Sequence, residues 1–477
     1  MSSIPAPGTT PYYSKSENIS PDDSLHKDKD QIVPYKIQFS AAKLADLKAR
    51  LDLARYPEPL AGHDEKNAMG MDLDELRVLV QYWKNDFNWA AREEMLNELS
   101  QFRTVIDDVD MHFIHVKSSY PDAMPLVMIH GWPSTNFDFY KVIPQLTDPA
   151  KFGRDPTYAF NVVAPALPGF GLSKTSPQFK IGAREAAVII AKLMRRLGYK
   201  KFMVFGCDWG SAVANFVAQF EEKQGEDNRI VGLVLNGMIA VPQFSWWTPI
   251  TNVKNVLSFM FPSLFYNEYE REMLKYQYEV YTHEIGYLTQ SITKPLTLGT
   301  VLHNSPVAVA AWLAEKYIAW TDASGIVIAP GTDDKKRMDM IKQKHDFSRH
   351  TLSHSISIDE LLTTIMLYWM TDSITSSVAF YHNTLDLTKP TDIFLSMGTN
   401  TTPVFVSEFA VDIMWAPQSW AHQQYKNVKK YCFHDNGGHF AAMEQPDELV
   451  NDFAVYRDII SGENAKPSMG VLNRKVE

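Results

Sequence analysis

The chain has 477 residues, a formal net charge of −10 and 45% hydrophobic residues. That length is too great for one small core and allows a large domain with an inserted or appended piece. The acidic balance argues against nucleic acid or an anionic membrane surface as the main partner. With only two cysteines, the chain has neither a disulfide framework nor a four-cysteine zinc site.

The first 33 residues are polar, contain proline and show no periodicity, which predicts a disordered tail. They lack the apolar segment of a signal peptide. No run of eighteen apolar residues occurs in the chain, so no membrane-spanning helix is predicted. A cytoplasmic location is therefore the expectation.

Residues 34–104 are predicted to form a helical N-terminal extension. Leu44, Leu47 and Leu51 recur at near-helical spacing, and further helical segments are predicted at 72–89 and 89–99. Apolar residues then alternate with polar ones over 104–116, which predicts a β-hairpin that turns at Asp107 and Asp108.

A run of short apolar strands follows the hairpin. The strands are predicted at 125–129, 158–166, 202–205 and 230–235, with a helix at 184–197, and strands resume at 402–406 and 427–433. Fully apolar strands that alternate with helices indicate a parallel sheet covered on both faces. The predicted fold class is therefore α/β, with a core made of residues 105–242 and 386–465.

The alternation is interrupted by residues 243–385, which are aromatic and helical in pattern. We interpret this stretch as a helical cap inserted into the core. Ser357 and Glu360 form a capping-box signature at the start of one of its helices. Residues 322–355 are polar and charged and are expected to form a long loop without an assigned role, and residues 466–477 are expected to be a tail.

The most informative motif is Gly206-Cys207-Asp208-Trp209-Gly210, which follows an apolar strand and precedes a helical segment. That layout matches the nucleophile elbow of α/β-hydrolases, the sharp turn that presents the central residue to the active site. Glycines suit the flanking positions because side chains there would collide with the strand and helix. An ordinary turn with a helix-capping aspartate would show the same five residues.

A central aspartate predicts displacement at carbon, because a carboxylate nucleophile leaves an alkyl-enzyme ester. Releasing that ester requires a base, and His439 follows the last predicted strand, after Gly437 and Gly438. Asp412 and Glu408 both follow the strand at 402–406 and are the candidates for the acid that orients the histidine. Asn236 is a weaker candidate, since an amide carries no charge to stabilise an imidazolium.

Two backbone N–H groups are candidates for an oxyanion hole. Trp132 lies in the turn after the strand at 125–129, and Trp209 follows the nucleophile. His130 is expected to hold that turn by bonding to the backbone. Cys207 and Ser211 are expected to pack beside the elbow rather than to react.

Several motifs, taken in order, resemble the microsomal-type epoxide hydrolases, which include juvenile hormone and fungal enzymes. The resemblance covers residues 33–456 and rests on the elbow together with His130-Gly131-Trp132-Pro133, Leu167-Pro168-Gly169-Phe170-Gly171-Leu172-Ser173, Thr293-Lys294-Pro295, Ser305-Pro306-Val307, Ala311-Trp312-Leu313-Ala314-Glu315-Lys316 and Gly437-Gly438-His439-Phe440-Ala441-Ala442. It also includes the N-terminal segments Leu47-Lys48-Ala49-Arg50-Leu51, Tyr82-Trp83 and Gln101-Phe102-Arg103-Thr104.

The resemblance implies an α/β-hydrolase fold that converts an epoxide and water to a vicinal diol without metal or cofactor. It implies that Tyr287 and Tyr381 protonate the epoxide oxygen. It favours Asp412 over Glu408, because the family places its acid eight residues before a tryptophan, here Trp420, with a proline between them. Cys207 stands where the family usually has glycine, and the membrane anchor of the mammalian relatives is not seen.

Other functions stay open at this stage. A haloalkane dehalogenase shares the aspartate nucleophile, a biosynthetic enzyme could open an epoxide with a substrate hydroxyl, and a binding protein could use the same fold. The aromatic cap suggests a bulky, apolar small-molecule substrate. The sequence leaves open the identity of that substrate and whether the protein is a homodimer.

Overall fold

The computed structural model describes residues 31–60, 69–175, 180–224, 230–238, 240–244, 246, 248–346, 348, 350–352, 356–385 and 396–462. The predicted tail at 466–477 lies outside these ranges, as does the tail at 1–33 except for its last three residues.

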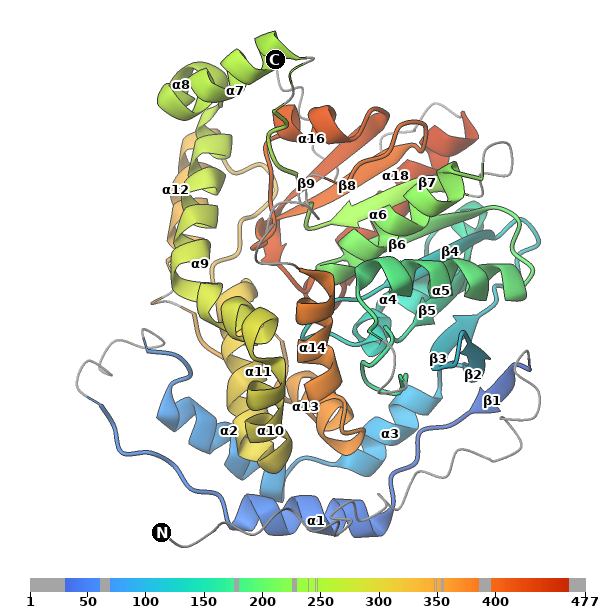
Figure 1. Ribbon diagram of the computed structural model, residues 1–477, viewed down its shortest axis with the longest axis vertical. Coiled ribbons are helices and arrows are strands. Elements are labelled where there is room, and N and C mark those ends of the chain that lie inside the picture. Colours follow the sequence, from blue (N-terminus) through green and yellow to red (C-terminus); the bar gives the residue numbers. More distant parts are fainter. Residues whose placement is uncertain are drawn as a thin grey trace, which may run out of the picture.

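The described residues form one nine-stranded sheet, ordered β1-β2-β3-β5-β4-β6-β7-β8-β9 (Figure 1). The pairs from β5 to β9 are parallel, and the pairs β1-β2, β2-β3 and β3-β5 are antiparallel. The prediction of a mostly parallel sheet is therefore confirmed. The strands are β1 (Val33–Tyr35), β2 (Gln101–Ile106), β3 (Val109–Val116), β4 (Met124–Ile129), β5 (Phe160–Pro165), β6 (Phe202–Cys207), β7 (Ile230–Asn236), β8 (Val404–Val411) and β9 (Val428–Gly438).

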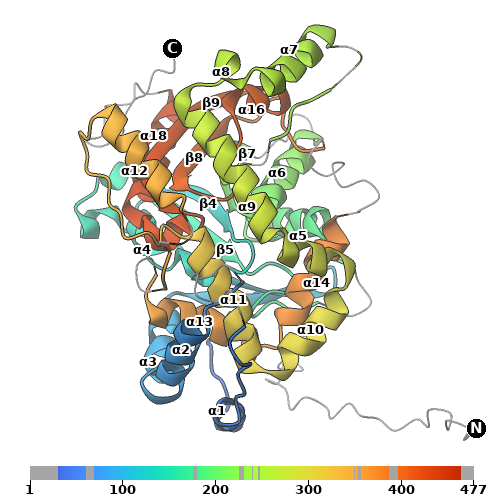
Figure 2. The same ribbon diagram turned by 90° about the vertical axis from the view of Figure 1, so that its left-hand side faces the viewer.

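Helices cover both faces of this sheet. Helices α5 (Ala183–Arg196) and α6 (Trp209–Glu222) pack together on one face, and α4 (Val142–Thr147) and α18 (Pro446–Ser461) pack on the other (Figures 1 and 2). The two layers explain why the central strands are apolar on both sides. In β6, for example, every residue from Phe202 to Phe205 is fully buried.

Between β7 and β8 the described chain is helical, and we refer to residues 243–385 as the cap. Its helices are α7 (Pro249–Met260), α8 (Pro262–Phe265), α9 (Glu268–Thr293), α10 (Pro295–Asn304), α11 (Pro306–Trp320), α12 (Asp334–Lys344), α13 (Ile358–Met370) and α14 (Ile374–Thr384). Across all the described residues, no helix is both long and apolar enough to cross a membrane.

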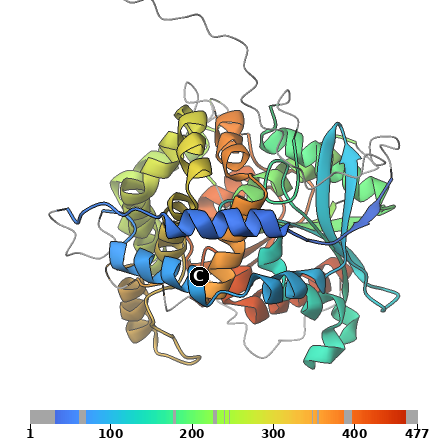
Figure 3. The ribbon, with the colours of Figure 1, turned by 90° about the horizontal axis from the view of Figure 1, so that it is seen from below.

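The N-terminal segment lies against the cap. Its helices are α1 (Ala41–Asp52), α2 (Leu73–Asn85) and α3 (Trp89–Asn97), and α1 runs beneath the cap helices (Figure 3). The Lys43 ammonium donates to the Met370 carbonyl, and the Tyr82 hydroxyl donates to Asp359 at 2.9 Å. Because β1 and β2 belong to the main sheet, the same segment ties one edge of the sheet to the cap.

The expectation of a loop over residues 322–355 is wrong for 334–344, which form α12. This helix buries charged as well as apolar residues, so its sequence lacks a hydrophobic stripe. Arg337 pairs with Asp435 at 2.8 Å, and Lys344 is fully buried against Asp322 and Asn436. Ion pairs with distant parts of the chain, which a local pattern does not reveal, hold the helix in place.

The largest differences from the predicted strands are at β1, β8 and β9, and β9 continues to Gly438 instead of ending at residue 433. Strand β1 was not expected, since three residues with a central proline carry little pattern; it forms because it pairs with β2. Strand β8 continues to Val411, so Glu408 lies within the strand rather than after it. The remaining short helices are α16 (Gln418–Gln424) and α17 (Ala441–Glu444), with 3-10 turns at Asn136–Phe139, Pro149–Phe152 and Pro156–Tyr158.

Candidate active site

Asp208 occupies a strained turn between β6 and α6. Its backbone has φ 52° and ψ −129°, a conformation that residues with side chains rarely adopt. A Cβ atom on Gly206 would lie 2.1 Å from the Gly210 carbonyl oxygen, and one on Gly210 would lie 2.0 Å from that of Ile129. Both flanking positions therefore require glycine, as the sequence predicted, and the turn projects a single side chain.

Replacement of Gly210 with alanine should destabilise the protein, because the new methyl group collides with backbone that cannot move aside. We expect a loss on the order of 3 kcal/mol, seen as a lower Tm. Gly286→Ala in α9 is the matched control: its Cβ meets no atom within 4 Å, and alanine favours a helix over glycine. Equal Tm values for the Gly210 variant and the native protein would contradict the packing argument.

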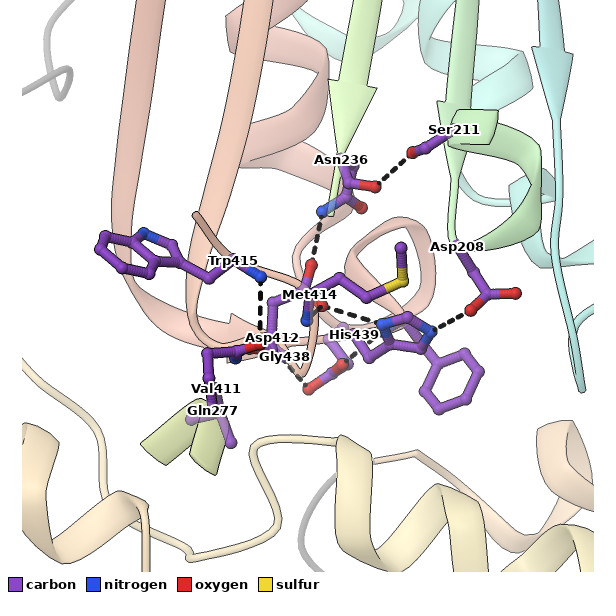
Figure 4. Close-up of polar contacts among 12 residues, drawn as sticks. Asp208, Ser211, Asn236, Gln277, Val411, Asp412, Met414, Trp415, Gly438 and His439 are labelled. Atoms are coloured by element: carbon purple, nitrogen blue, oxygen red, sulfur yellow. Dashed lines mark hydrogen bonds and ion pairs between the residues drawn. The ribbon is translucent and has the colours of Figure 1, made fainter. Parts of the chain in front are cut away.

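The side chains of Asp208 and Asp412 both contact that of His439, and the three residues follow separate strands (Figure 4). Its Nε2 lies 3.4 Å from Oδ2 of Asp208, and its Nδ1 lies 2.9 Å from Oδ1 of Asp412. Asp208, Asp412 and His439 are all at least nine-tenths buried. The structure thus brings together the three residues that the sequence proposed as nucleophile, acid and base.

Of the two candidate acids, only Asp412 contacts the histidine. Its second oxygen accepts from the Asn236 amide at 3.1 Å, and the Met414 N–H donates to its first oxygen at 3.0 Å. Glu408 instead accepts a hydrogen bond from the Trp415 indole at 2.9 Å. Asn236 therefore contacts the acid rather than the imidazole.

The turn that carries His439 is fixed by carboxylates that the sequence did not single out. Glu444 accepts from the N–H groups of Gly438 and Phe440, and Asp322 accepts from the N–H of Gly437 at 3.0 Å. Asp322 begins the polar segment 322–355, for which the sequence predicted no role. Nothing in the neighbouring residues relates Asp322 to a turn more than a hundred residues away. Part of the segment without an assigned role therefore supports the histidine.

His439 carries a strongly shifted pKa. Burial lowers it, but the charges of Asp412 and Asp208, the hydrogen bond to Asp412 and the close contact with Asp208 raise the pKa of His439 to about 10. The resting site therefore holds an imidazolium between two carboxylates at neutral pH. Loss of either negative charge would move the histidine towards its neutral, basic form.

This arrangement predicts a pH-dependent contribution to stability. Since the pKa of His439 is higher in the folded chain than its ordinary value of 6.5, the contribution is full below pH 6.5 and is lost as the pH rises through about 10. The Tm difference between the native protein and His439→Gln should be largest near pH 6 and shrink by pH 10. A difference that does not change with pH would contradict the charged resting state.

The backbone N–H groups proposed for the oxyanion hole lie around Asp208. The Trp132 N–H donates to Oδ1 of Asp208 at 2.7 Å. Trp209 is the first residue of α6, so its N–H has no acceptor within the helix. His130 is bonded to the backbone as expected: its Nδ1 lies 2.8 Å from the Gly131 carbonyl, and its Nε2 accepts from the Leu167 N–H.

The two tyrosines lie opposite Asp208, Tyr287 on α9 and Tyr381 on α14. Their ring centroids are 5.9 Å apart, and both rings pack on Trp132. Within the described part of the chain, the buried Tyr381 hydroxyl makes no hydrogen bond. Burial raises the pKa of both phenols, so both keep their protons at neutral pH.

A cavity of about 430 Å³ separates the elbow from the cap and is lined by Asp208, Tyr287 and Tyr381. Its remaining wall is mainly apolar or aromatic, and includes Met238, Val280, Leu288, Trp320 and Trp415. Such a chamber fits an apolar small molecule that presents one reactive polar group to the carboxylate.

Cys207 and Ser211 point away from this chemistry. Burial strongly raises the pKa of the Cys207 thiol, which makes it a poor nucleophile. The Ser211 hydroxyl donates to the carbonyls of Gly206 and Asn236, so it holds α6 against two strands. Both residues have the packing roles that the sequence suggested.

Two protein-family models match this chain, and together they span residues 32–272. Residues 32–139 match the family model described as epoxide hydrolase N terminus, and residues 124–272 match the α/β hydrolase fold. Among solved structures, juvenile hormone epoxide hydrolase from the silkworm Bombyx mori has a TM-score of 0.77 at 27% identity, covering 93% of this chain and 97% of that one. Aspergillus niger epoxide hydrolase has a TM-score of 0.70 at 25% identity, covering 90% and 97%.

Curated relatives match over almost the whole chain. Epoxide hydrolase 1 of Sus scrofa is 33% identical over 438 residues, covering 90% of this chain and 89% of the relative. Juvenile hormone epoxide hydrolase 1 of Ctenocephalides felis is 30% identical over 429 residues, covering 88% and 84%. The fold is therefore that of the α/β-hydrolases, and the chain belongs to the epoxide hydrolase family.

Proposed function

We propose that this protein hydrolyses an apolar epoxide to a vicinal diol through an ester on Asp208. The observation that carries the proposal is the position of one buried carboxylate between an imidazole at 3.4 Å and a cavity lined by two protonated phenols. A nucleophile and two acids face one chamber, and a base lies beside the nucleophile, which matches the requirements of epoxide opening and ester hydrolysis.

In the first step Asp208 attacks a ring carbon and the carbon–oxygen bond of the epoxide breaks. The alkoxide that forms takes a proton from Tyr287 or Tyr381, whose hydroxyls are the acids of the cavity. The products are a neutral ester and a phenolate. Because Asp208 loses its charge in this step, one of the two carboxylates that raise the pKa of His439 disappears.

That loss of charge makes His439 ready to act as a base. The imidazolium now releases its proton, which restores the phenol by way of water. Neutral His439, oriented by Asp412, then takes a proton from a second water, whose oxygen attacks the ester carbonyl. The oxyanion is stabilised by the N–H groups of Trp132 and Trp209, and its collapse releases the diol and the Asp208 carboxylate with His439 again charged.

Turnover in ¹⁸O-water tests the ester route directly. Over repeated turnovers we expect label to enter the Asp208 side chain, because water attacks the carbonyl carbon that belongs to the protein. Digestion and mass spectrometry of the peptide that contains Asp208 give the readout. Diol formation that leaves this peptide unlabelled would refute the covalent route.

A second assay, with a panel of substrates, separates the nearest rival. A haloalkane dehalogenase also forms an aspartyl ester, and we therefore expect a panel of aryl, lipid and terpenoid epoxides to yield diols while chloroalkanes release no halide. Halide release without diol formation would indicate a haloalkane dehalogenase. If no epoxide of the panel and no chloroalkane reacts, the result would favour a binding protein.

A further inference from the structure

Lys316 is a buried cation beside the cavity. It lies on α11 and is only 3% exposed. Its ammonium is 2.7 Å from the Glu284 carboxylate and 2.9 Å from that of Glu315. Burial of an ammonium is costly unless it is paired, so this position is strongly constrained.

The same ammonium faces the ring of Tyr287. It lies 4.9 Å from the ring centroid of Tyr287 and 5.6 Å from that of Trp320. Glu284 precedes Tyr287 by one turn of α9 and accepts from the Trp320 indole at 3.2 Å. Lys316 therefore connects three groups in the cavity wall: Glu284, Tyr287 and Trp320.

We propose that Lys316 is a positioning residue for Tyr287, holding its ring over the cavity and favouring transfer of its proton to the opening epoxide; this inference rests on the proposed function. A cation at the ring face stabilises negative charge that develops on the phenol. Lys316 also balances Glu284 and Glu315, whose charges both raise the pKa of Tyr287. Without it, two carboxylates near Tyr287 would oppose phenolate formation.

The proposal predicts an effect on one half of the reaction. Lys316→Met should slow ring opening about tenfold, which lies between the effects expected for an exposed and for a desolvated cation–π contact. Hydrolysis of the ester uses His439 and water, so its rate should stay within about twofold. Single-turnover kinetics with the fastest epoxide of the panel separate the two steps, because rapid quenching measures the protein-bound ester directly. Equal slowing of both steps would mean a purely structural ion pair.

A double-mutant cycle with Tyr287→Phe tests whether Lys316 acts through the phenol. In the Tyr287→Phe protein, where Tyr381 is the remaining acid, Lys316→Met should have little further effect on ring opening. Another tenfold loss there would overturn the proposal. Lys316→Arg should restore most of the ring-opening rate, since it keeps the cation.

If Lys316→Met does not fold, a double variant without the Lys316 and Glu284 charges provides the test. The double variant Lys316→Gln with Glu284→Gln removes the ion pair between these two residues, keeps two hydrogen-bonding side chains and leaves Glu315 unchanged. This double variant should fold and should open the ring several-fold more slowly than the native protein. A native rate of ring opening would overturn the proposal. Lys275→Met, which breaks an exposed ion pair with Glu279 on α9, is the control and should change neither step.

The outcomes also separate this inference from the proposed function. If the native protein forms no ester on Asp208, the proposed function fails. If the native protein forms the ester and Lys316→Met forms it at the native rate, only the role of Lys316 fails.

Discussion

Replacement of Asp208 with alanine should lower diol formation by about 10⁴-fold or more, since the variant lacks the elbow carboxylate that attacks the ring. The fold should survive, because Asp208 contributes its backbone to the turn and alanine is smaller than aspartate. Steady-state diol formation gives the rate, and incubation with an epoxide followed by intact-protein mass spectrometry should show no covalent adduct. Circular dichroism checks the fold.

Cys207→Ala is the matched control for this experiment. It alters the neighbouring residue, whose thiol contacts the Ile129 carbonyl and has a strongly raised pKa. This variant should keep near-native diol formation and still acquire the adduct. An active Asp208→Ala protein, or an inactive Cys207→Ala protein with an intact fold, would assign the attack to a different group.

Replacement of His439 with glutamine should stop the reaction after one event per active site. Ring opening needs Asp208 and the tyrosines, whereas hydrolysis of the ester needs the base. Glutamine cannot take a proton from water, so turnover should fall by about 10³-fold or more. Because ring opening continues, a stable adduct should accumulate to one equivalent, visible as a mass increase equal to that of the epoxide.

His422→Gln is the control for a histidine change outside the site, since this residue is exposed on α16. It should turn over normally and accumulate no adduct. If His439→Gln shows neither diol formation nor an adduct, the histidine takes part in ring opening as well, and the division of labour proposed above is wrong.

Sequence predicted much of the fold because the relevant signals are local. Strands β4 to β7 and helix α5 were found within a few residues, since an apolar run or a helical period depends on neighbouring residues alone. The elbow was recognisable for a similar reason: Gly206 and Gly210 are required by contacts within and next to the turn. Helix α12 and strand β1 escaped prediction because distant partners stabilise them.

The residues of the candidate site also differ in whether neighbouring residues in the sequence identify them. Asp208 and His439 stand out in the sequence because glycine-rich motifs surround them. The tyrosines came only from resemblance, since a chain with 21 tyrosines offers no local reason to choose Tyr287 and Tyr381. Lys316 belonged to a motif, but its relation to Tyr287 is invisible along the chain.

The sequence by itself determined the order of the strands along the chain, the elbow and the chemical character of a carboxylate nucleophile, because backbone sterics and side-chain chemistry act at short range. Only the tertiary structure decided that Asp412 rather than Glu408 contacts His439 and that Lys316 faces Tyr287. Both depend on which strand ends and helix faces meet after packing, and that is fixed by the whole core rather than by any one segment.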